Sequence, residues 1–256
     1  MKTTTLFGRD LCTGDKQTLA ACLSGNSRQG ARSMFFCNVH MLMLSQQDTD
    51  LAAAMSSADF VFPDGMPLAW LQKRLGNPEA DVLRGYEAME HLCQQAAVRG
   101  EPVGFFGATE NVLSALADNL GRRYPGLKID YLCAPGVIGD SPGFKTQVAA
   151  EINAKKLSHL FVGLGCPKQE KWAAIYNSHL NCDVLCVGAA FDWVAGTIKR
   201  PPAWMENVGL AWFFRLLQNP RRMWRRYLIY NFKFIFMAIR LTILGKPEGQ
   251  QEQDEN

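Results

Sequence analysis

The chain has 256 residues, of which 48% are hydrophobic and 20% charged, and its formal net charge is +3. This length suits one α/β domain with an appendage, or two small domains, and the apolar content excludes intrinsic disorder over most of the chain. So small a net charge excludes a protein that binds nucleic acid through its overall charge.

Short apolar runs alternate with helical patterns through the first two hundred residues. The expected strands are residues 33–39, 59–62, 102–106, 128–133, 159–164 and 184–187. The expected helices are residues 40–57, 66–75, 87–99, 111–124, 144–155 and 168–180. Strands that alternate with helices of this length are typical of βαβ units. We therefore expect an α/β fold: a Rossmann-like, mostly parallel sheet with helices on both faces.

The composition changes after Arg200-Pro201-Pro202. From Trp212 to Lys246 there are eight basic residues and no acid, which leaves the rest of the chain with 19 basic and 24 acidic residues, a formal −5. Two helices are expected here, 212–217 and 220–244. We thus predict a catalytic α/β domain over 1–200, a basic, aromatic helical appendage over 201–246, and a disordered acidic tail over 247–256.

The eight cysteines are scattered and form no C-x-x-C pair, and the N-terminal residues have no apolar stretch typical of an export signal. Reduced thiols in a cytosolic protein are therefore expected, several of them as small core residues. Cys182 and Cys186 lack a second ligand pair, so no metal site is predicted.

Four loops follow predicted strands, where parallel α/β sheets bind their ligands. In the first, Asn38 either reads a ligand with its amide or caps the next helix. In the second, Asp64 within Pro63-Asp64-Gly65 is either a turn residue or a general base. Its apolar strand, Phe60–Phe62, would desolvate the carboxylate and raise its pKa.

The other two loops suit phosphate groups. Residues 105–111 place Gly107 before a helix N-terminus, a weak signal because many structural turns look alike. Residues 162–170 read Val-Gly-Leu-Gly-Cys-Pro-Lys-Gln-Glu, with a cation and an amide at a helix start. This is no dinucleotide fingerprint, because Lys168 stands where G-x-G-x-x-G has its third glycine.

Asp48-Thr49-Asp50 has the D-x-D form of the metal motif of many sugar transferases. No apolar strand precedes it. We therefore interpret it as a helix start or a solvated face.

Several of these strings together resemble the WecG/TagA/CpsF glycosyltransferases, glycosyltransferase family 26. The likeness covers about residues 33–235 in the correct order. It rests on Asn38, Pro63–Gly65, Val162–Glu170, Val187–Asp192, Gly196, Arg200–Pro202 and Gly209–Arg226.

The resemblance implies an inverting transfer, without metal or other cofactor, from a UDP-sugar to a sugar on polyprenyl (undecaprenyl) diphosphate. Such transfers build bacterial cell-surface or exopolysaccharides. The donated sugar, a hexose or N-acetylhexosamine such as glucose or N-acetylmannosamine, is left open, as is a homo-oligomer. The site would lie at the cytoplasmic face of the cell membrane.

The resemblance also implies roles for particular residues. Asp64 is the expected catalytic base, with Asn38 beside it. The appendage would close over the active site and bind the lipid diphosphate through Arg215, Arg222 and Arg225. The residues expected to bind the UDP-sugar are Arg84, Gly107, Gly163, Gly165, Lys168, Gln169, Glu170 and Asp192.

Three positions depart from the family pattern. Phe36 stands where the family often has threonine, and Ala211-Trp212 where many members have Glu-Trp. Arg84, directly before Gly85, is matched to the arginine that precedes the glycine of this loop in the family. These departures bear on the donor sugar more than on the class of enzyme.

The basic segment also has a physical interpretation of its own. Arg222, Arg225 and Arg226 lie three and four apart, so one helical face presents several guanidinium forks that suit a diphosphate. Aromatic residues stand among these charges from Trp224 to Phe236. A solvated charged face explains the arginines but not the aromatic residues, whereas an anionic membrane surface explains both. Asn231, Lys233 and Arg240 argue against a spanning helix.

Two other functions suit the sequence less well. A nucleotide-dependent oxidoreductase would need the complete glycine fingerprint. A non-catalytic, membrane-associated scaffold for polysaccharide assembly would leave the strand-end loops unexplained.

Overall fold

The computed structural model describes residues 2–24, 31–136 and 142–244. The predicted acidic tail, 247–256, lies outside the described residues. Within them the strands are β1 (Thr3–Leu6), β2 (Arg9–Cys12), β3 (Ser33–Cys37), β4 (Phe60–Pro63), β5 (Pro102–Gly107), β6 (Lys128–Cys133), β7 (His159–Gly163) and β8 (Asp183–Cys186).

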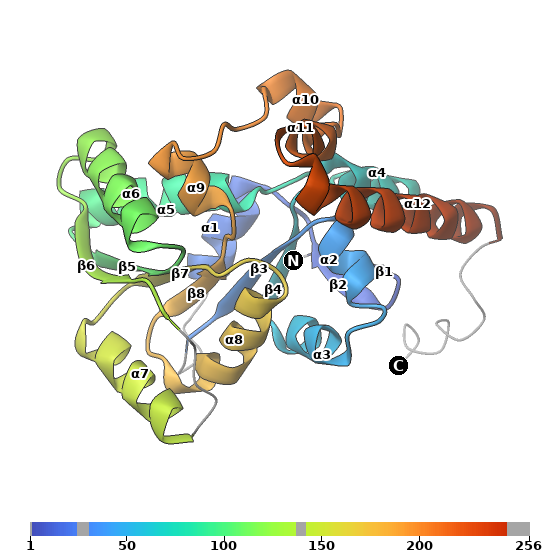
Figure 1. Ribbon diagram of the computed structural model, residues 1–256. Helices are drawn as coiled ribbons and strands as arrows, with labels where there is room; N and C mark the ends of the chain where they lie inside the picture. Colours follow the sequence, from blue (N-terminus) through green and yellow to red (C-terminus); the bar gives the residue numbers. More distant parts are fainter. Residues whose placement is uncertain (1, 25–30, 137–141, 245–256) are drawn as a thin grey trace.

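Helices follow most strands (Figure 1). They are α1 (Lys16–Ser24), α2 (Val39–Leu44), α3 (Thr49–Ser57), α4 (Met66–Arg74), α5 (Gly85–Arg99), α6 (Glu110–Arg123), α7 (Pro142–Ala154), α8 (Lys168–Tyr176), α9 (Ala190–Ala195), α10 (Ala203–Asn207), α11 (Ala211–Gln218) and α12 (Pro220–Leu244), with a 3-10 turn at Asn177–His179.

Six strands form one parallel sheet in the order β4-β3-β8-β7-β5-β6. The inner strands β3, β8, β7 and β5 are short and buried, as expected for a sheet that is covered on both faces, whereas the edge strand β6 is partly polar and exposed. The loop after β3 leads to α2 on one face of the sheet, whereas the loop after the neighbouring strand β8 leads to α9 on the other face. Loops that leave adjacent strands toward opposite faces form a topological switch point, where ligands bind beyond the carboxyl ends of the strands.

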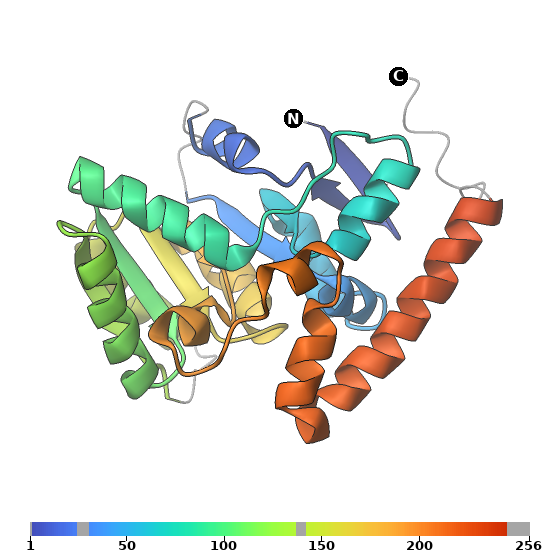
Figure 2. The same cartoon turned by 90° about the horizontal axis from the view of Figure 1, so that it is seen from above.

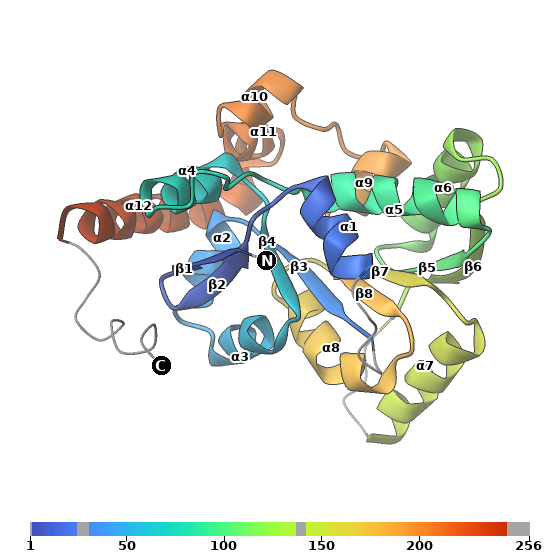
Figure 3. The same cartoon turned by 180° about the vertical axis from the view of Figure 1, so that it is seen from behind.

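Alternate strand residues fill two separate cores. Phe35 and Val162 belong to the core beneath α2, α3, α7 and α8, whereas Phe36 and Phe161 belong to the core beneath α1, α5, α6 and α9. Figures 1 and 3 show these two helix layers on opposite faces of the sheet. The predicted parallel α/β sheet with helices on both faces is confirmed.

The single helix expected over residues 40–57 is wrong. Two helices, α2 and α3, occupy this segment, because the Asp48 side chain accepts a hydrogen bond from the backbone N–H of Leu51, 3.0 Å away, and so begins a second helix. Asp48 and Asp50 of the D-x-D string both pair with Lys171 of α8, at 2.7 and 3.3 Å. These aspartates therefore have a structural role.

The N-terminal residues form a second, two-stranded sheet that the sequence interpretation did not include. β1 and β2 pair antiparallel across the turn Phe7-Gly8, both of which have positive φ angles. Leu6 and Leu11 are fully buried and join the core beneath α2. Several cysteines are small core residues, as expected, since Cys12, Cys37, Cys93, Cys182 and Cys186 are all buried.

The appendage has one face packed on the domain. α12 contacts α2, where Phe234 is 7% exposed and lies edge-on to Phe7, with ring centroids 6.1 Å apart. Tyr230 lies edge-on to His40 in the same way, at 4.9 Å. Figure 2 shows α11 and α12 as a V beside the sheet. One face of α12 is thus part of the hydrophobic core.

Two phenylalanines of α12 test this arrangement. Phe234 is buried whereas Phe236 is 68% exposed. Phe234→Ala should lower the free energy of unfolding by about 3 kcal/mol, because it leaves a cavity, and Phe236→Ala by less than about 0.5 kcal/mol. Urea unfolding of both variants measures the difference. Equal effects would contradict a packed inner face.

Candidate active site

Four strands end at one enclosed space. The loops after β4, β3, β8 and β7 border a cavity of about 270 Å³, and α11 and α12 close it from the other side. This volume lies just below the usual range for ligand sites, about 300–1,000 Å³. Its lining includes Asn38, Asp64, Gly163, Gly165, Gln169, Glu170, Asp192 and Arg215. The structure thus brings together residues from three of the four predicted loops, from the loop after β8 and from the appendage.

Asp64 lies at the tip of β4. Its backbone N–H donates to the carbonyl oxygen of Cys37, 2.6 Å away, which fixes the tip of β4 against that of β3. The helix that follows, α4, has Gly65 as its N-cap and no side-chain cap. Asp64 therefore does not cap that helix, and its side chain lines the cavity.

Burial in this recess raises the pKa of Asp64 from 3.8 to about 7. Arg215 and Arg84 oppose the effect by lowering the pKa, whereas Glu87 and Glu206 reinforce it. Desolvation is the largest of these effects, as expected for a carboxylate whose remaining exposed surface faces a cavity. A carboxyl with this pKa can accept a proton near neutral pH.

Asn38 has a structural role and also reaches the cavity. Its side-chain oxygen accepts a hydrogen bond from the N–H of Met41, 3.2 Å away, and so caps α2. With the oxygen occupied, the amide nitrogen is the group that can donate to a ligand. The cap interpretation is therefore confirmed, while contact with a ligand stays a prediction.

Arg215 reaches the same cavity from α11. Its guanidinium lies over the ring of Trp193, 4.4 Å from the ring centroid. Its Nε is buried, with no hydrogen-bond partner among the described residues. A partly buried cation that lies over an aromatic ring and has an unused donor is suited to phosphate oxygens.

Gln169 braces the loop after β7. Its side-chain oxygen accepts from the N–H of Gly165 at 3.1 Å, while its Nε2 donates to Glu170 and to the Cys186 carbonyl, at 2.8 and 3.1 Å. Both residues are buried. These bonds fix the shape of the loop where it borders the cavity, so Gln169 and Glu170 hold the backbone of Gly163 and Gly165 in place.

The glycines at the strand ends are required by packing. A Cβ on Gly163 would lie 2.5 Å from the ring of Phe191, and one on Gly107 would lie 2.6 Å from the backbone of Gly163. Gly165 has φ +80, in the left-handed region that favours glycine. Packing therefore explains Gly107 and Gly163 without a ligand.

Four expected site residues lie outside this cavity lining. Gly107 is covered by Gly163, and Lys168 is exposed. Arg84 lies beside the cavity that contains Asp64. It lines a neighbouring cavity of about 420 Å³, together with Glu87 and Asn207. Arg225 is exposed, its guanidinium 5.3 Å from the Trp224 ring centroid. The side chain of Arg222 lies outside the described part of the chain.

Several cavity-lining residues were not among the expected site residues. They include Tyr86, Trp193, Gln218 and Met223. Trp193 is one residue from Asp192, and Gln218 and Met223 lie within the Gly209–Arg226 string, so these motifs could have indicated them. Nothing in the local sequence indicates Tyr86, which comes from α5 and meets the others only in the fold.

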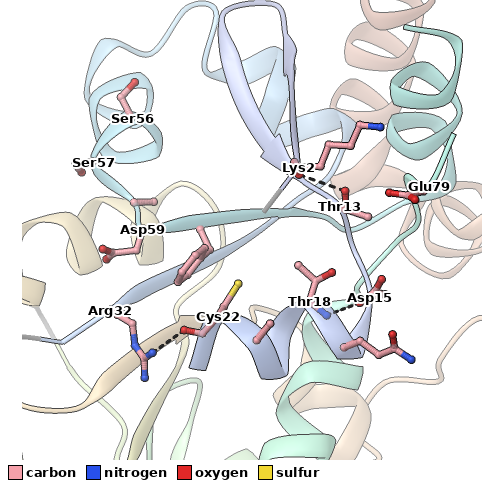
Figure 4. Close-up of a pocket in the computed structure, with 14 residues that line it drawn as sticks. Lys2, Thr13, Asp15, Thr18, Cys22, Arg32, Ser56, Ser57, Asp59 and Glu79 are labelled. Atoms are coloured by element: carbon pink, nitrogen blue, oxygen red, sulfur yellow. Dashed lines mark hydrogen bonds between the residues drawn. The ribbon is translucent and has the colours of Figure 1, made fainter. Parts of the chain in front are cut away.

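A larger hollow lies at the opposite edge of the sheet, before β3 and β4 (Figure 4). Its volume is about 1060 Å³, but its central polar groups hold the fold together. Arg32 pairs with Asp183 at 2.7 Å and donates to the Cys22 carbonyl, while Asp59 accepts from the N–H of Ser33 at 2.8 Å. The smaller cavity is therefore the better candidate for catalysis.

Comparison with known proteins gives the family of the chain. A model of the Glycosyl transferase WecG/TagA/CpsF family matches residues 6–247. The chain belongs to this family, so it is a glycosyltransferase.

Three relatives carry the name N-acetylglucosaminyldiphosphoundecaprenol N-acetyl-beta-D-mannosaminyltransferase. The protein from Bacillus spizizenii is 33% identical over 189 residues, 72% of this chain and 70% of its own. That from Bacillus subtilis is 30% identical, over 75% and 73%, and that from Staphylococcus aureus 26% identical, over 78% of each chain.

The raised pKa of Asp64 predicts an effect on stability. Between about pH 4 and pH 7 the carboxyl is ionised in the unfolded chain but protonated in the folded one, so the folded state loses stability as the pH rises. Asp64→Asn should therefore be more stable than the natural chain at pH 8, by up to about 4 kcal/mol, and equally stable below pH 4. Urea unfolding at both pH values measures this.

Asp118→Asn, on the exposed surface of α6, is the matched control and should differ by less than about 0.5 kcal/mol at either pH. An Asp64→Asn variant that is less stable at pH 8 would show that the carboxylate is well solvated or stably paired.

Proposed function

We propose that this chain transfers N-acetylmannosamine from its UDP derivative to N-acetylglucosamine carried on undecaprenyl diphosphate, with Asp64 as the general base. One observation carries the proposal: a carboxylate with a pKa of about 7 lines a cavity at the switch point of the sheet, opposite an arginine of the appendage. The names of the relatives support the choice of sugars and lipid carrier. They favour N-acetylmannosamine over glucose as the donated sugar.

In the proposed reaction, a hydroxyl oxygen of the acceptor sugar attacks the anomeric carbon of the donor. The bond between that carbon and the UDP oxygen breaks, and UDP leaves with the bonding electrons. Asp64 takes the proton of the attacking hydroxyl. Attack opposite the leaving group inverts the configuration of the anomeric carbon. A base with a pKa near 7 is matched to this step at neutral pH.

The departing UDP needs positive charge close to its phosphates. Arg215 supplies it, since its guanidinium lies over Trp193 and its Nε has no partner among the described residues. Arg84 lies on another side of Asp64 and lowers its pKa, so its charge also reaches the cavity. Gly163, Gly165 and Asp192 line the cavity where we place the nucleotide and its sugar.

The outer face of the appendage suits a membrane surface. Apolar side chains spaced three or four residues apart along α12 are exposed, with more on α11; they are Phe213, Leu217, Trp224, Leu228, Ile229, Phe232, Ile235, Phe236, Ile239 and Ile243. Arg221, Arg225 and Arg240 are exposed on the same helix. An amphipathic helix with basic residues binds an anionic bilayer in this way.

No described helix combines the length and the apolarity needed to cross a bilayer. We place the protein on the cytoplasmic face of the membrane, where α12 brings the cavity to the lipid-linked acceptor. Arg222 and Arg225 remain candidates for binding the lipid diphosphate.

Asp64→Asn tests the base. It should reduce turnover by about a thousandfold or more, since it removes proton transfer and the negative charge, while UDP affinity changes less than about threefold. The assay supplies UDP-N-acetylmannosamine, UDP-glucose or UDP-N-acetylglucosamine with a short-chain polyprenyl diphosphate N-acetylglucosamine. Calorimetry measures UDP binding.

Asp118→Asn serves again as the control and should keep full activity. Near-normal turnover in Asp64→Asn would remove this residue from the mechanism. Transfer from UDP-glucose alone would keep the enzyme class and overturn the donor. Absence of UDP binding would favour the scaffold interpretation.

The double variant Phe232→Ser, Phe236→Ser tests the membrane surface. Both side chains are more than two-thirds exposed, so the fold should be unaffected, while binding to vesicles of anionic lipid should weaken by roughly tenfold or more. Val98→Ser, on α5 and 85% exposed, is the control and should bind as the natural chain does. Co-sedimentation with vesicles measures binding. Unchanged binding in the double variant would contradict the proposed membrane face.

A further inference from the structure

A buried carboxylate links the appendage to the domain beside the cavity. Glu206, on α10, has a side chain only 4% exposed. It accepts hydrogen bonds from Arg200, with distances of 3.2 Å to Oε1 and 2.7 Å to Oε2. The hydroxyl oxygen of Tyr86 lies 3.4 Å from Oε2 of Glu206, and Nε of Arg84 lies 3.8 Å away. We call Arg84, Tyr86, Glu87, Arg200 and Glu206 the Glu206 cluster.

The cluster joins distant segments of the chain. Arg84, Tyr86 and Glu87 stand at the start of α5, where Glu87 accepts hydrogen bonds from the hydroxyl of Tyr86 at 2.8 Å and from Arg84 at 3.2 Å. Arg200 belongs to the connection between α9 and α10, and Glu206 to α10. The amide oxygen of Asn207 adds a further contact to Arg84, at 3.4 Å. α10 is thus fixed to α5 by several charged hydrogen bonds.

A continuous stack runs from this cluster to Arg215. The guanidinium of Arg200 lies 3.7 Å from the ring centroid of Tyr86. The Tyr86 ring is edge-on to Trp193, at 5.5 Å, and Trp193 in turn carries the guanidinium of Arg215, at 4.4 Å. Cation and ring contacts of this kind stabilise one relative placement of the groups.

The start of α11 is fixed at a second point. Gly209, between α10 and α11, has φ +73, and a Cβ on it would lie 3.0 Å from the ring of Trp70 on α4. The chain therefore turns tightly against α4 before α11 begins at Ala211. With α10 held by Glu206 and this corner held by Trp70, the position of Arg215 in the first turns of α11 is determined.

We infer that Glu206 is a positioning residue for the transfer reaction: by holding Arg84 and Arg200, it fixes α10 and α11 so that Arg84 and Arg215 keep their places around Asp64. The inference rests on the proposed role of Asp64 as base. A cluster in which every charge is paired is expected to specify a single arrangement, and removal of one partner leaves the others buried and uncompensated.

The cluster also affects the charge that Asp64 experiences. Charged groups around Asp64 come from five helices. They are Arg84 and Glu87 at the start of α5, Glu170 on α8, Asp192 on α9, Glu206 on α10 and Arg215 on α11. Glu206 raises the pKa of Asp64. Loss of its charge should lower that pKa, whereas loss of the charge on Arg200 would leave Glu206 less compensated and raise it.

The test compares Glu206→Gln with the natural chain by hydrogen exchange and by steady-state transfer over a range of pH. We expect amide exchange in α10 and α11 to accelerate by about tenfold or more, and kcat per folded enzyme to fall by about tenfold or more, because small misplacements of a catalytic group are costly. The acidic limb of the rate profile should move to lower pH.

Arg200→Gln is the second variant, useful if Glu206→Gln does not fold, since the Arg200 side chain is 39% exposed and easier to replace. It should accelerate the same exchange and lower kcat, but move the acidic limb to higher pH. Glu90→Gln, on α5, removes a paired glutamate that contacts Arg123 outside the site. As the control, it should leave amide exchange in α10 and α11 unchanged. It should also leave kcat and the acidic limb of the pH–rate profile unchanged.

The outcomes separate this inference from the proposed function. If Asp64→Asn is inactive while both cluster variants match the control, the positioning role is overturned and the proposed function stands. If the variants only lose stability, with kcat per folded enzyme and the pH profile unchanged, the positioning role is likewise overturned. If Asp64→Asn stays active while exchange in α10 and α11 accelerates, the proposed base fails and the link between Glu206 and the appendage stands.

Discussion

The burial of one carboxylate between the end of a strand and a cationic helix is the constraint on which the site depends. Asp64 can be held there because the tip of β4 is bonded to that of β3 and because α11 closes the space opposite. Burial alone would make the negative charge very costly, and arginines alone would make the carboxyl a weak base. The balance of the two gives a pKa of about 7.

The appendage serves two purposes because its helices have two different faces. The inner face of α12 packs on α2 through Phe234 and Tyr230, while its outer face leaves Phe232 and Phe236 exposed. A helix attached only to a membrane could not hold Arg215 steadily opposite Asp64, and a fully buried one could not contact lipid. In the account proposed above, a single rigid element brings the cavity and the membrane-bound acceptor together.

Much of the fold could be predicted from the sequence because its signals are local. Apolar runs such as Phe60–Phe62 and the loops that follow them indicated both the parallel sheet and the edge where the site lies. The hairpin of β1 and β2 was missed because its turn, Phe7-Gly8, lacks the Asn-Gly or Asp-Gly signal, and the pair lies outside the main sheet. The break between α2 and α3 depended on the cap at Asp48, which competes with a continuous helical pattern.

The site was harder to predict, because many of its contacts join residues that are far apart in the sequence. Asp64 and Asn38 follow strands and were expected, and they lie together. Gln169 was expected to bind the donor, but its buried amide is hydrogen-bonded to the loop itself. The sequence motif could not distinguish this structural role from ligand binding. Glu206 gave no signal at all, because its partners are Tyr86, Arg84 and Arg200, and the first two are more than a hundred residues away. Contacts of that range are properties of the fold.

The pH dependence of kcat/KM for sugar transfer tests the central claim most directly. If Asp64 is the base and is ionised only when its raised pKa is exceeded, the rate should rise tenfold per pH unit below about pH 7 and level off above it. A rate that is already constant from pH 5 upward would show that the reacting base has an ordinary carboxyl pKa, and would contradict the account of a buried Asp64 held between the sheet and the appendage.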